Sequence, residues 1–230
     1  MISIVIPAKN EKEEIIATLI RIKKYVTINF ECLIVVDSAD DSTTSTVKPF
    51  VENDARFKVL ISNLPPGPGN AIKFGMNSSI GDCIIVTMAD GCDDISQIDK
   101  MYDLISRGVS VVNASRYMKG GQQLGSSGLK PILSKFAGLS LYYLARIQTK
   151  DSTNSFKAYS KNFINNIEID SGSGFELGLQ LVIKAKKQKL LIAEIPTIWI
   201  ERHLGTSKFK LYRWLPNYIY WYLYAFKIGK

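Results

Sequence analysis

Carboxylate, amide and guanidinium side chains follow the short apolar runs of this 230-residue chain. Each run predicts a buried strand, and in open α/β sheets ligands bind beyond the carboxyl ends of the strands. We therefore expect these polar residues to converge on one edge of a sheet. They are Asn10 and Glu11 after residues 2–7, Asp37 after 32–36, Asp90, Asp93 and Asp94 after 83–88, and Arg116 after 109–114.

The acids around Asp90 form the sharpest of these clusters. Carboxylates on a short loop suit a hard divalent cation, Mg²⁺ or Mn²⁺, which also takes oxygens from substrate phosphates. Such a cation neutralises a diphosphate leaving group as its bond to carbon breaks. Arg202 and Lys208 supply cationic donors for the same diphosphate, although a solvated loop explains their segment equally well. Asp94, directly before Ile95, is also explained as a helix cap.

The elements that must position these residues alternate between strands and helices. Asn10 and Glu13 match a capping box that starts a helix, and further helices are predicted from about residues 42, 71 and 95. Strands are expected at 2–7, 32–36, 57–61, 83–88 and 109–114. This alternation predicts an α/β fold with a mostly parallel sheet and helices on both faces.

The second half of the chain departs from this rhythm. Residues 119–128 are rich in Gly, Gln and Ser and predict a loop. Helices are expected at 132–144 and 175–187, and a strand at 190–200. The length fits one domain. We expect residues 1–115 to form its nucleotide-binding half, 116–208 to complete the pocket, and 209–230 to form a last helix.

What the sequence lacks excludes several classes of site. No G-x-G-x-x-G follows the first predicted strand, which excludes a Rossmann dinucleotide site, and no Lys-Ser/Thr follows Gly67 and Gly69, which excludes a P-loop. His203 is the single histidine, so no site can use two imidazoles. The three cysteines lack Cys-x-x-Cys spacing; this excludes a zinc ribbon and a disulfide scaffold, and indicates a reducing compartment.

Positive charge and aromatic rings gather at the C-terminal end. The chain holds 29 Lys and Arg against 21 Asp and Glu, a net charge of +8, and residues 184–230 account for all of that excess. Residues 209–226 contain nine aromatic side chains. This combination predicts a helix that lies on an anionic membrane surface. A core helix edged with solvated lysines and a nucleic-acid contact are the alternatives.

Neither a membrane span nor a signal peptide is predicted. Arg213 and Pro216 interrupt the C-terminal apolar run, and Lys227 ends it below the roughly 20 residues that a span needs. The first apolar run is short and has no basic flank. We therefore expect a cytoplasmic protein that is peripheral on the cytosolic face of a membrane.

Eight motifs, taken in order, span nearly the whole chain. They are IVIPAKNE at 4–11, VVDSADDST at 35–43, GPGNAIKFGM at 67–76, VTMADGCDD at 86–94, ASRYMKGG at 114–121, DSTNSFKAYS at 151–160, GFELGLQLVIKA at 174–185 and EIPTIWIERHLGTSKF at 194–209. Single motifs are loose, but the set is specific. It resembles the inverting family 2 glycosyltransferases of GT-A fold, most of all the dolichol- and polyprenyl-phosphate mannosyltransferases.

This resemblance implies a role for particular residues. The base and ribose of a nucleotide sugar would be held by Pro7, Ala8, Asn10, Glu11 and Asp37, with Gly69 completing that wall. Asp90 would bind the metal, with Asp93 or Asp94 as a further ligand, and Arg202 and Lys208 would steady the diphosphate. Arg116 would bind the phosphate of a lipid acceptor, helped by Lys119 or Lys130, while Asp151, Asn154 and Glu176 would line the sugar and acceptor pocket.

The resemblance also implies a reaction. A hexose of mannose or glucose type would pass from a GDP- or UDP-sugar to a polyprenyl phosphate, with inversion and with no nucleic acid involved. An anionic phosphate needs no strong base, whereas a saccharide or glycolipid hydroxyl would need a carboxylate such as Asp151 or Glu176. One departure concerns the metal motif, where Met88 replaces the first acid of the usual Asp-x-Asp. A non-catalytic nucleotide- or nucleic-acid-binding module is the remaining alternative.

Overall fold

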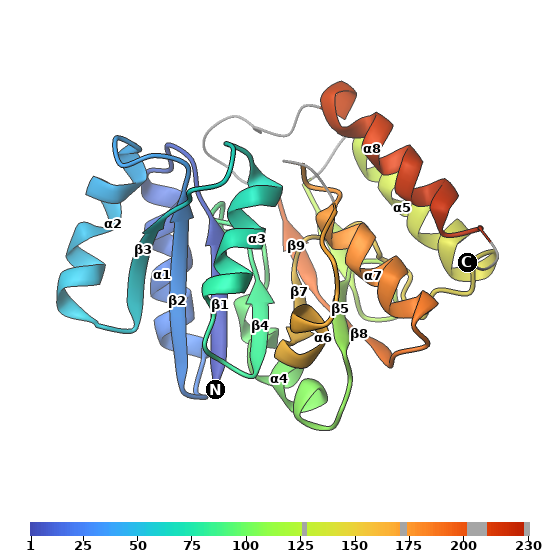
Figure 1. Ribbon diagram of the computed structural model, residues 1–230, viewed down its shortest axis with the longest axis horizontal. Helices are drawn as coiled ribbons and strands as arrows, with labels where there is room; N and C mark the ends of the chain where they lie inside the picture. The colour runs from blue at the N-terminus through green and yellow to red at the C-terminus, as the bar shows by residue number, and fades with distance from the viewer. Residues whose placement is uncertain (126–127, 171–173, 202–210, 228–230) are drawn as a thin grey trace.

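The computed structural model describes the chain except for residues 126–127, 171–173, 202–210 and 228–230. A seven-stranded sheet in the order β3-β2-β1-β4-β7-β5-β8 runs through its centre (Figure 1). The strands of this sheet are β1 (Ile2–Pro7), β2 (Phe30–Val36), β3 (Phe57–Ile61), β4 (Cys83–Val86), β5 (Val111–Ser115), β7 (Lys157–Ser160) and β8 (Ile192–Pro196).

Helices cover both faces of this sheet. Buried side chains of α1, α2 and α4 pack on one face, and those of α3, α6 and α7 pack on the other. The helices are α1 (Glu13–Tyr25), α2 (Ser42–Asn53), α3 (Pro68–Ser78), η1 (Ile95–Gln97), α4 (Ile98–Ser106), α5 (Leu129–Tyr143), α6 (Lys161–Asn165), α7 (Leu177–Lys187) and α8 (Leu211–Tyr224). Because both faces are covered, β1, β2 and β4 are buried along their whole length. The predicted α/β fold with a mostly parallel sheet is confirmed.

One strand runs against the others and was not predicted. β7 pairs antiparallel with both β4 and β5, so that Lys157 lies opposite Val86 and Asn113. The amino end of β7 therefore reaches the same edge of the sheet as the carboxyl ends of β4 and β5. This arrangement carries residues 151–157 to the edge where ligands bind in such sheets.

A small second sheet and two helices lie beside this edge. β6 (Gln122–Leu124) pairs with β9 (Ile198–Ile200), and α5 lies next to α8 at the right-hand side of Figure 1. Gly138 lets α5 pack closely against the backbone at Lys150, since a Cβ at this position would lie 2.2 Å from the carbonyl oxygen of Lys150. No helix in the described ranges is long and apolar enough to cross a bilayer.

Several predicted elements differ in the structure. The capping box at Asn10 is wrong: α1 begins at Glu13, and its N-cap Lys12 makes no side-chain cap. The strand predicted at 190–200 is two strands in different sheets, β8 and β9; between them the Thr197 N–H donates to the Ser115 carbonyl of the main sheet, and the Thr197 carbonyl accepts from the N–H of Gln122 in the second sheet. The loop predicted at 119–128 contains β6, and the strand predicted at 83–88 ends at Val86.

Candidate active site

The loop after β1 is held by the start of α2. The backbone N–H of Asn10 donates to Asp41 Oδ1 at 2.9 Å, and that of Glu11 donates to Thr43 Oγ1 at 3.0 Å. Asp41 also caps α2, because it accepts from the backbone N–H of Thr43. Asn10 has the left-handed φ of 48°, which an Asn tolerates better than most residues. Pro7, at the end of β1, is buried, as are Ala8 and Glu11.

Asp37 joins this loop to the loop before α3. Its Oδ2 lies 3.4 Å from Lys9 Nζ, and its Oδ1 accepts from the backbone N–H of Gly67 at 3.2 Å. Gly67 has φ 150°, which favours a glycine, and Gly69 follows inside the first turn of α3. The nucleotide-binding residues predicted around Asp37 therefore lie on three adjoining loops at the carboxyl ends of β1, β2 and β3.

The loop after β4 is organised by a buried carboxylate. Asp93 Oδ2 accepts from Thr87 Oγ1 at 2.9 Å and from the Met88 N–H at 3.0 Å. Burial, together with the charge of Asp90, raises the pKa of Asp93 to about 6, against the lowering effect of these two hydrogen bonds. Asp94 Oδ1 accepts from the backbone N–H of Ser96 and caps η1. Asp93 is buried and holds the loop, whereas Asp90 and Asp94 are both partly exposed and only Asp94 is engaged as a helix cap.

These acids fit a cation that is shared with a substrate. The described residues contain no group of three or more His, Cys, Asp or Glu side chains that could hold a metal by themselves. Mg²⁺ is commonly bound through one or two carboxylates together with substrate phosphates. Asp90, whose Oδ1 accepts from the backbone N–H of Cys92 at 3.2 Å, could supply such a carboxylate.

A buried ion pair lies at the end of β5. Arg116 Nε donates to Asp151 Oδ2 at 2.7 Å, and Arg116 Nη2 donates to Asp151 Oδ1 at 2.8 Å. The backbone N–H of Arg116 also donates to Asp151, and Nη2 reaches Ser134 Oγ on α5 at 3.1 Å. Burial opposes the charge of Arg116, but the attraction of Asp151 outweighs it and raises the pKa of Arg116 above its ordinary value.

Hydroxyl groups continue this network. Ser134 Oγ accepts from Tyr117 Oη at 3.0 Å and lies 2.7 Å from Thr153 Oγ1. Asn154 holds the segment before β7 in place, since its Nδ2 donates to the carbonyl oxygen of Ala114 at 2.8 Å. The sequence did not single out Tyr117, Ser134 or Thr153, because isolated hydroxyls in loops and helices carry no recognisable spacing.

Lys157 is a further residue that sequence reasoning missed. Its side chain is completely buried, and its Nζ makes no hydrogen bond within the described part of the chain. Burial lowers the pKa of Lys157 to about 7; the charge of Asp151 works against this and that of Arg116 adds to it. The only signal in the sequence was the position of Lys157 inside the motif at 151–160.

Glu176 connects α7 to α8. It is the fully buried N-cap of α7, and its Oε1 accepts from Asn217 Nδ2 at 3.0 Å. The other carboxylate oxygen, Oε2, accepts no hydrogen bond from a described residue. A buried carboxylate oxygen without a donor is costly, so it suits a site where a ligand supplies one.

The structure brings many of the predicted residues to one edge of the sheet. Asp93, Arg116, Asp151 and Lys157 lie close enough for the charge of one to affect the pKa of another. Lys119 is exposed, and no bond from its side chain to a described residue supports a role. Arg202 and Lys208 lie outside the described residues, and so does the side chain of Lys130.

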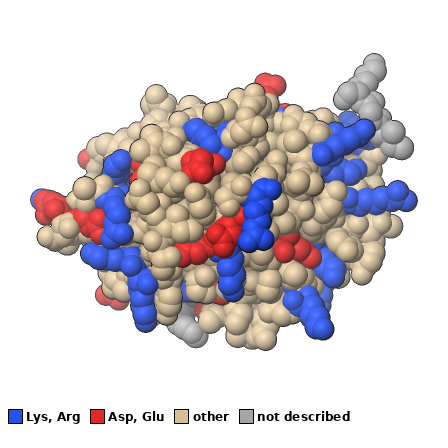
Figure 2. Space-filling model, turned by 90° about the horizontal axis from the view of Figure 1, so that it is seen from below, with Lys and Arg blue, Asp and Glu red and all other residues tan. Residues whose placement is uncertain are grey.

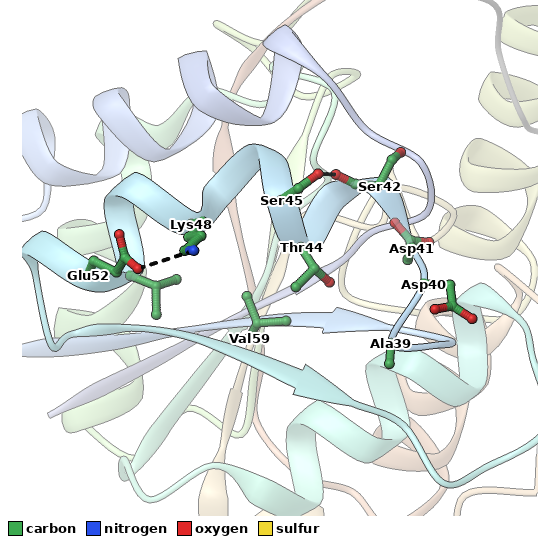
Figure 3. A pocket seen from close by; sticks show the side chains of 10 residues that line it. Ala39, Asp40, Asp41, Ser42, Thr44, Ser45, Lys48, Glu52 and Val59 are labelled. Atoms are coloured by element: carbon green, nitrogen blue, oxygen red, sulfur yellow. Dashed lines mark hydrogen bonds and ion pairs between the residues drawn. The ribbon is translucent and has the colours of Figure 1, made fainter.

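A hollow of about 540 Å³ lies elsewhere, between α2 and the edge strand β3 (Figure 3). Asp41, Thr44 and Val59 are among its lining residues, and an exposed ion pair of 3.7 Å joins Lys48 to Glu52 at its far end. Such an exposed pair contributes little. The sheet order places β2 and β1 between β3 and β4, the strand whose following loop carries Asp90.

Comparisons with known proteins agree with this arrangement. The chain is 27% identical over 212 residues to the dolichol-phosphate mannosyltransferase of Pyrococcus furiosus, which covers 91% of this chain and 59% of that protein. It is 25% identical over 211 residues to the polyprenol monophosphomannose synthase of Mycolicibacterium smegmatis, covering 89% of this chain and 79% of the relative. The chain thus spans little more than half of the first of these relatives.

Solved structures share the fold. Glucosyl-3-phosphoglycerate synthase from Mycobacterium tuberculosis, in complex with UDP, superimposes with a TM-score of 0.73 at 15% identity and covers all of this chain and 81% of that one. The same enzyme with Mg²⁺ and UDP gives a TM-score of 0.74 at 14% identity, covering all of this chain and 80% of that one. At this level of identity the likeness shows the GT-A fold.

The family itself follows from the sequence profile. The profile of Glycosyl transferase family 2 matches residues 3–168, which is well over half of the chain and includes the loops after β1, β2 and β4 and the Arg116–Asp151 pair. The chain belongs to glycosyl transferase family 2.

Proposed function

We propose that this protein transfers a hexose from a nucleotide sugar to a polyprenyl phosphate, with inversion at the anomeric carbon. The observation that carries the acceptor assignment is the hydrogen bonding of the Arg116 guanidinium. Asp151 and Ser134 engage Nε and Nη2, while Nη1 makes no hydrogen bond to a described residue. A guanidinium fixed in this way has one donor group left for a phosphate oxygen, and its charge is permanent.

In this proposal the two halves of the chain bind different substrates. Residues 1–115 bind the donor: Pro7, Ala8, Asn10, Glu11, Asp37 and Gly69 surround the base and ribose. Residues 116–208 bind the acceptor through Arg116, with Arg202 and Lys208 on the diphosphate. The names of both relatives, a dolichol-phosphate mannosyltransferase and a polyprenol monophosphomannose synthase, include a phosphate-bearing lipid or its mannose product, which supports the acceptor class.

The reaction is a direct displacement. An acceptor phosphate oxygen forms a bond to the anomeric carbon while the bond from that carbon to the diphosphate breaks, and the electron pair leaves with the nucleoside diphosphate. No proton has to move, so the side chains act by position and charge. Asp90, with Asp93 behind it, would hold a divalent cation, which neutralises the departing diphosphate; structural neighbours contain Mn²⁺ or Mg²⁺. Arg116 orients the attacking phosphate.

The proposal places the protein on the cytosolic face of a membrane, with α8 as a contact. The free, buried cysteines Cys32, Cys83 and Cys92 support a reducing compartment. α8 carries the aromatic side chains that favour a membrane interface.

One observation favours a hydroxyl acceptor as the second candidate. Glu176 is buried, and its Oε2 accepts no hydrogen bond from a described residue, so it is available to take a proton from a hydroxyl. Under this alternative the fold and the donor stay the same, and Glu176, or Asp151 once separated from Arg116, acts as the base.

The test is release of nucleoside diphosphate from a panel of UDP- and GDP-hexoses, with Mg²⁺ or Mn²⁺ and with a short-chain prenyl phosphate. We expect one donor to be consumed, and only when the prenyl phosphate is present. Consumption that instead needs a saccharide would favour the hydroxyl candidate. Absence of release with every donor and acceptor would reject both.

A further inference from the structure

Two side chains of α1 hold the loop that carries Asp90. Thr18 Oγ1 donates to the carbonyl oxygen of Ala89 at 3.1 Å, and Arg21 Nη1 donates to the carbonyl oxygen of Gly91 at 2.7 Å. The partners are 71 and 70 positions apart in the chain, so these contacts belong to the fold and not to local structure. Residues three apart share a helix face, and α1 therefore presents both side chains to this loop.

The two carbonyl groups lie on either side of Asp90. The Ala89 carbonyl belongs to the peptide unit directly before Asp90. The Gly91 carbonyl shares its peptide unit with the N–H of Cys92, which donates to Asp90 Oδ1 at 3.2 Å. Because a peptide unit is planar, a bond to its carbonyl orients the whole unit, including its N–H. The two bonds from α1 therefore set the direction in which the Asp90 carboxylate points.

The loop also packs directly on this helix. Thr18 and Ala89 are both buried, and Ala89 lies in the same core cluster as the buried apolar side chains of α1. Gly91 has a left-handed φ of 73°, and a Cβ at this position would lie 3.8 Å from Thr18 Oγ1. On its other side the loop is held by β9, where the Ile200 N–H donates to the Cys92 carbonyl at 3.2 Å.

Neither contact from α1 is required by the helix itself. A threonine within a helix commonly bonds the carbonyl four residues earlier, and Thr18 Oγ1 lies 3.2 Å from the Glu14 carbonyl oxygen. Its one hydrogen is thus shared between the helix and the loop. Arg21 is only partly buried, a position from which a long charged side chain can extend into water. Both side chains instead reach the loop, so they serve the loop.

The same helix starts at the donor loop. α1 begins at Glu13, two residues after Glu11, whose backbone N–H is held by Thr43. One helix of 13 residues therefore connects the loop proposed for the base and ribose with the loop proposed for the cation. Both groups belong to one nucleotide, and a rigid element keeps their binding sites at a constant separation.

We propose that Thr18 and Arg21 are positioning residues of the cation site. They hold Asp90 in the orientation in which it binds a divalent cation against the diphosphate of the donor, and they act only through the backbone of the loop. This inference rests on the proposed function, which assigns the cation to Asp90.

The test is isothermal titration of the full chain with UDP and with GDP, each in the presence and in the absence of Mn²⁺. The ratio of the two Kd values for one nucleotide is the gain in affinity that the cation provides. Thr18→Val keeps the shape of the side chain and removes its hydroxyl, and Arg21→Met removes the guanidinium. Thr18→Ser and Arg21→Lys each restore a donor.

Thr27→Val is the matched control. It removes a hydroxyl that donates to Asp99 Oδ2 at 2.6 Å, between α1 and the start of β2. This is the amino-end side of the parallel strands, opposite the loop of Asp90. Figure 2 shows the molecule from this side, where acidic and basic side chains are interspersed over the left and middle of the view.

We expect the wild type and Thr27→Val to show the same gain from Mn²⁺. Thr18→Val and Arg21→Met should each reduce it about tenfold, the usual loss when a group that orients a metal ligand is removed. Their affinity without Mn²⁺ should stay unchanged, because the contacts to base and ribose remain, whereas damage to the fold would lower both affinities. Thr18→Ser should regain most of the gain and Arg21→Lys part of it.

Asp90→Asn separates this inference from the proposed function. A gain in the wild type that Asp90→Asn abolishes supports the cation site. An unchanged gain in both Thr18→Val and Arg21→Met would then overturn the positioning role alone, and so would an equal loss in Thr27→Val. No gain in the wild type, or a full gain in Asp90→Asn, would overturn the assignment of Asp90 and the positioning role with it.

Discussion

Asp151 holds the guanidinium of Arg116 by both of its carboxylate oxygens, with N–O distances of 2.7 and 2.8 Å. The acid is fully buried and the arginine nearly so. Two parallel bonds fix the plane of the guanidinium, which a single bond would leave free to turn. The pair therefore sets the direction in which the remaining N–H groups of Arg116 point, and with it the position that an anionic acceptor would take.

Replacement of Arg116 should affect stability and transfer together. Arg116→Gln leaves the buried charge of Asp151 without its partner, and we expect it to lower the free energy of unfolding by about 3–5 kcal/mol. Urea unfolding measures this loss. Arg116→Lys keeps the charge but not the two-bond geometry, so it should regain part of the stability and little of the transfer rate.

The chain offers a matched control for that prediction. Arg56 forms the same two-bond contact with Asp54, at 2.9 and 2.7 Å, but its side chain is 41% exposed. Arg56→Gln should cost less than about 1 kcal/mol and leave transfer unchanged. Equal costs for Arg56→Gln and Arg116→Gln would contradict the buried role of the Arg116 pair.

Asp90→Asn should reduce transfer at least about a hundredfold while the fold stays intact. The amide oxygen can still accept from the Cys92 N–H, so the loop keeps its bond, but the charge that attracts a cation is lost. Rates measured against Mg²⁺ concentration check this. Asp82→Asn, at the other end of β4, is the control and should behave as wild type. Unchanged cation dependence in Asp90→Asn would remove Asp90 from the site.

Asp41→Ala should weaken nucleotide binding indirectly, because Asp41 holds the donor loop and does not itself contact the nucleotide in this proposal. It removes the cap of α2, which costs about 1–2 kcal/mol, and also the acceptor for the Asn10 N–H. Isothermal titration with the nucleoside diphosphate measures the effect. Ser160→Ala removes the cap of α6 at the opposite edge and should lose stability only. Similar affinities in both variants would show that the Asp41 contact does not shape the donor loop.

Lys157 should make stability depend on pH in a defined direction. Its pKa of about 7 lies below the ordinary 10.5, so below pH 7 the lysine is charged in both states and the cost of burying that charge is fully present. Between these values the unfolded chain binds a proton that the folded chain does not, so stability rises with pH.

Lys157→Met removes this dependence. The variant should exceed the wild type in stability most at about pH 6, and its advantage should shrink towards about pH 9. Urea unfolding at both pH values measures the difference. A constant difference between the two proteins would show that Lys157 does not titrate in this window.

The half of the site that binds the donor was predictable because it depends on buried parallel strands. The runs at β1, β2 and β4 are apolar throughout, since both faces of the sheet are covered, and the residues that follow them must meet at one edge. The sequence predicts Asn10 as a helix cap, but in the structure it is a loop residue with a left-handed backbone. This was not predictable, because the backbone of Asn10 is held by Asp41, which lies far along the chain.

The other half depends on contacts that local sequence does not encode. β7 is Lys-Ala-Tyr-Ser, which has no apolar run, and its antiparallel place comes from pairing with β4 and β5. The partnership of Arg116 with Asp151, and the burial of Lys157, follow from that pairing. Composition predicts that a lysine is exposed, so its position inside the sheet could be found only from the structure.

The most direct test of the central claim compares a short-chain prenyl phosphate with the prenol of the same chain length. Release of nucleoside diphosphate and the mass of the lipid product are followed with the wild type and with Arg116→Lys. We predict that the wild type forms a hexosyl phosphoprenol, that prenol is not a substrate, and that Arg116→Lys raises the KM for prenyl phosphate. Equal transfer to prenol and prenyl phosphate would contradict the assignment of Arg116 and of a phosphate acceptor.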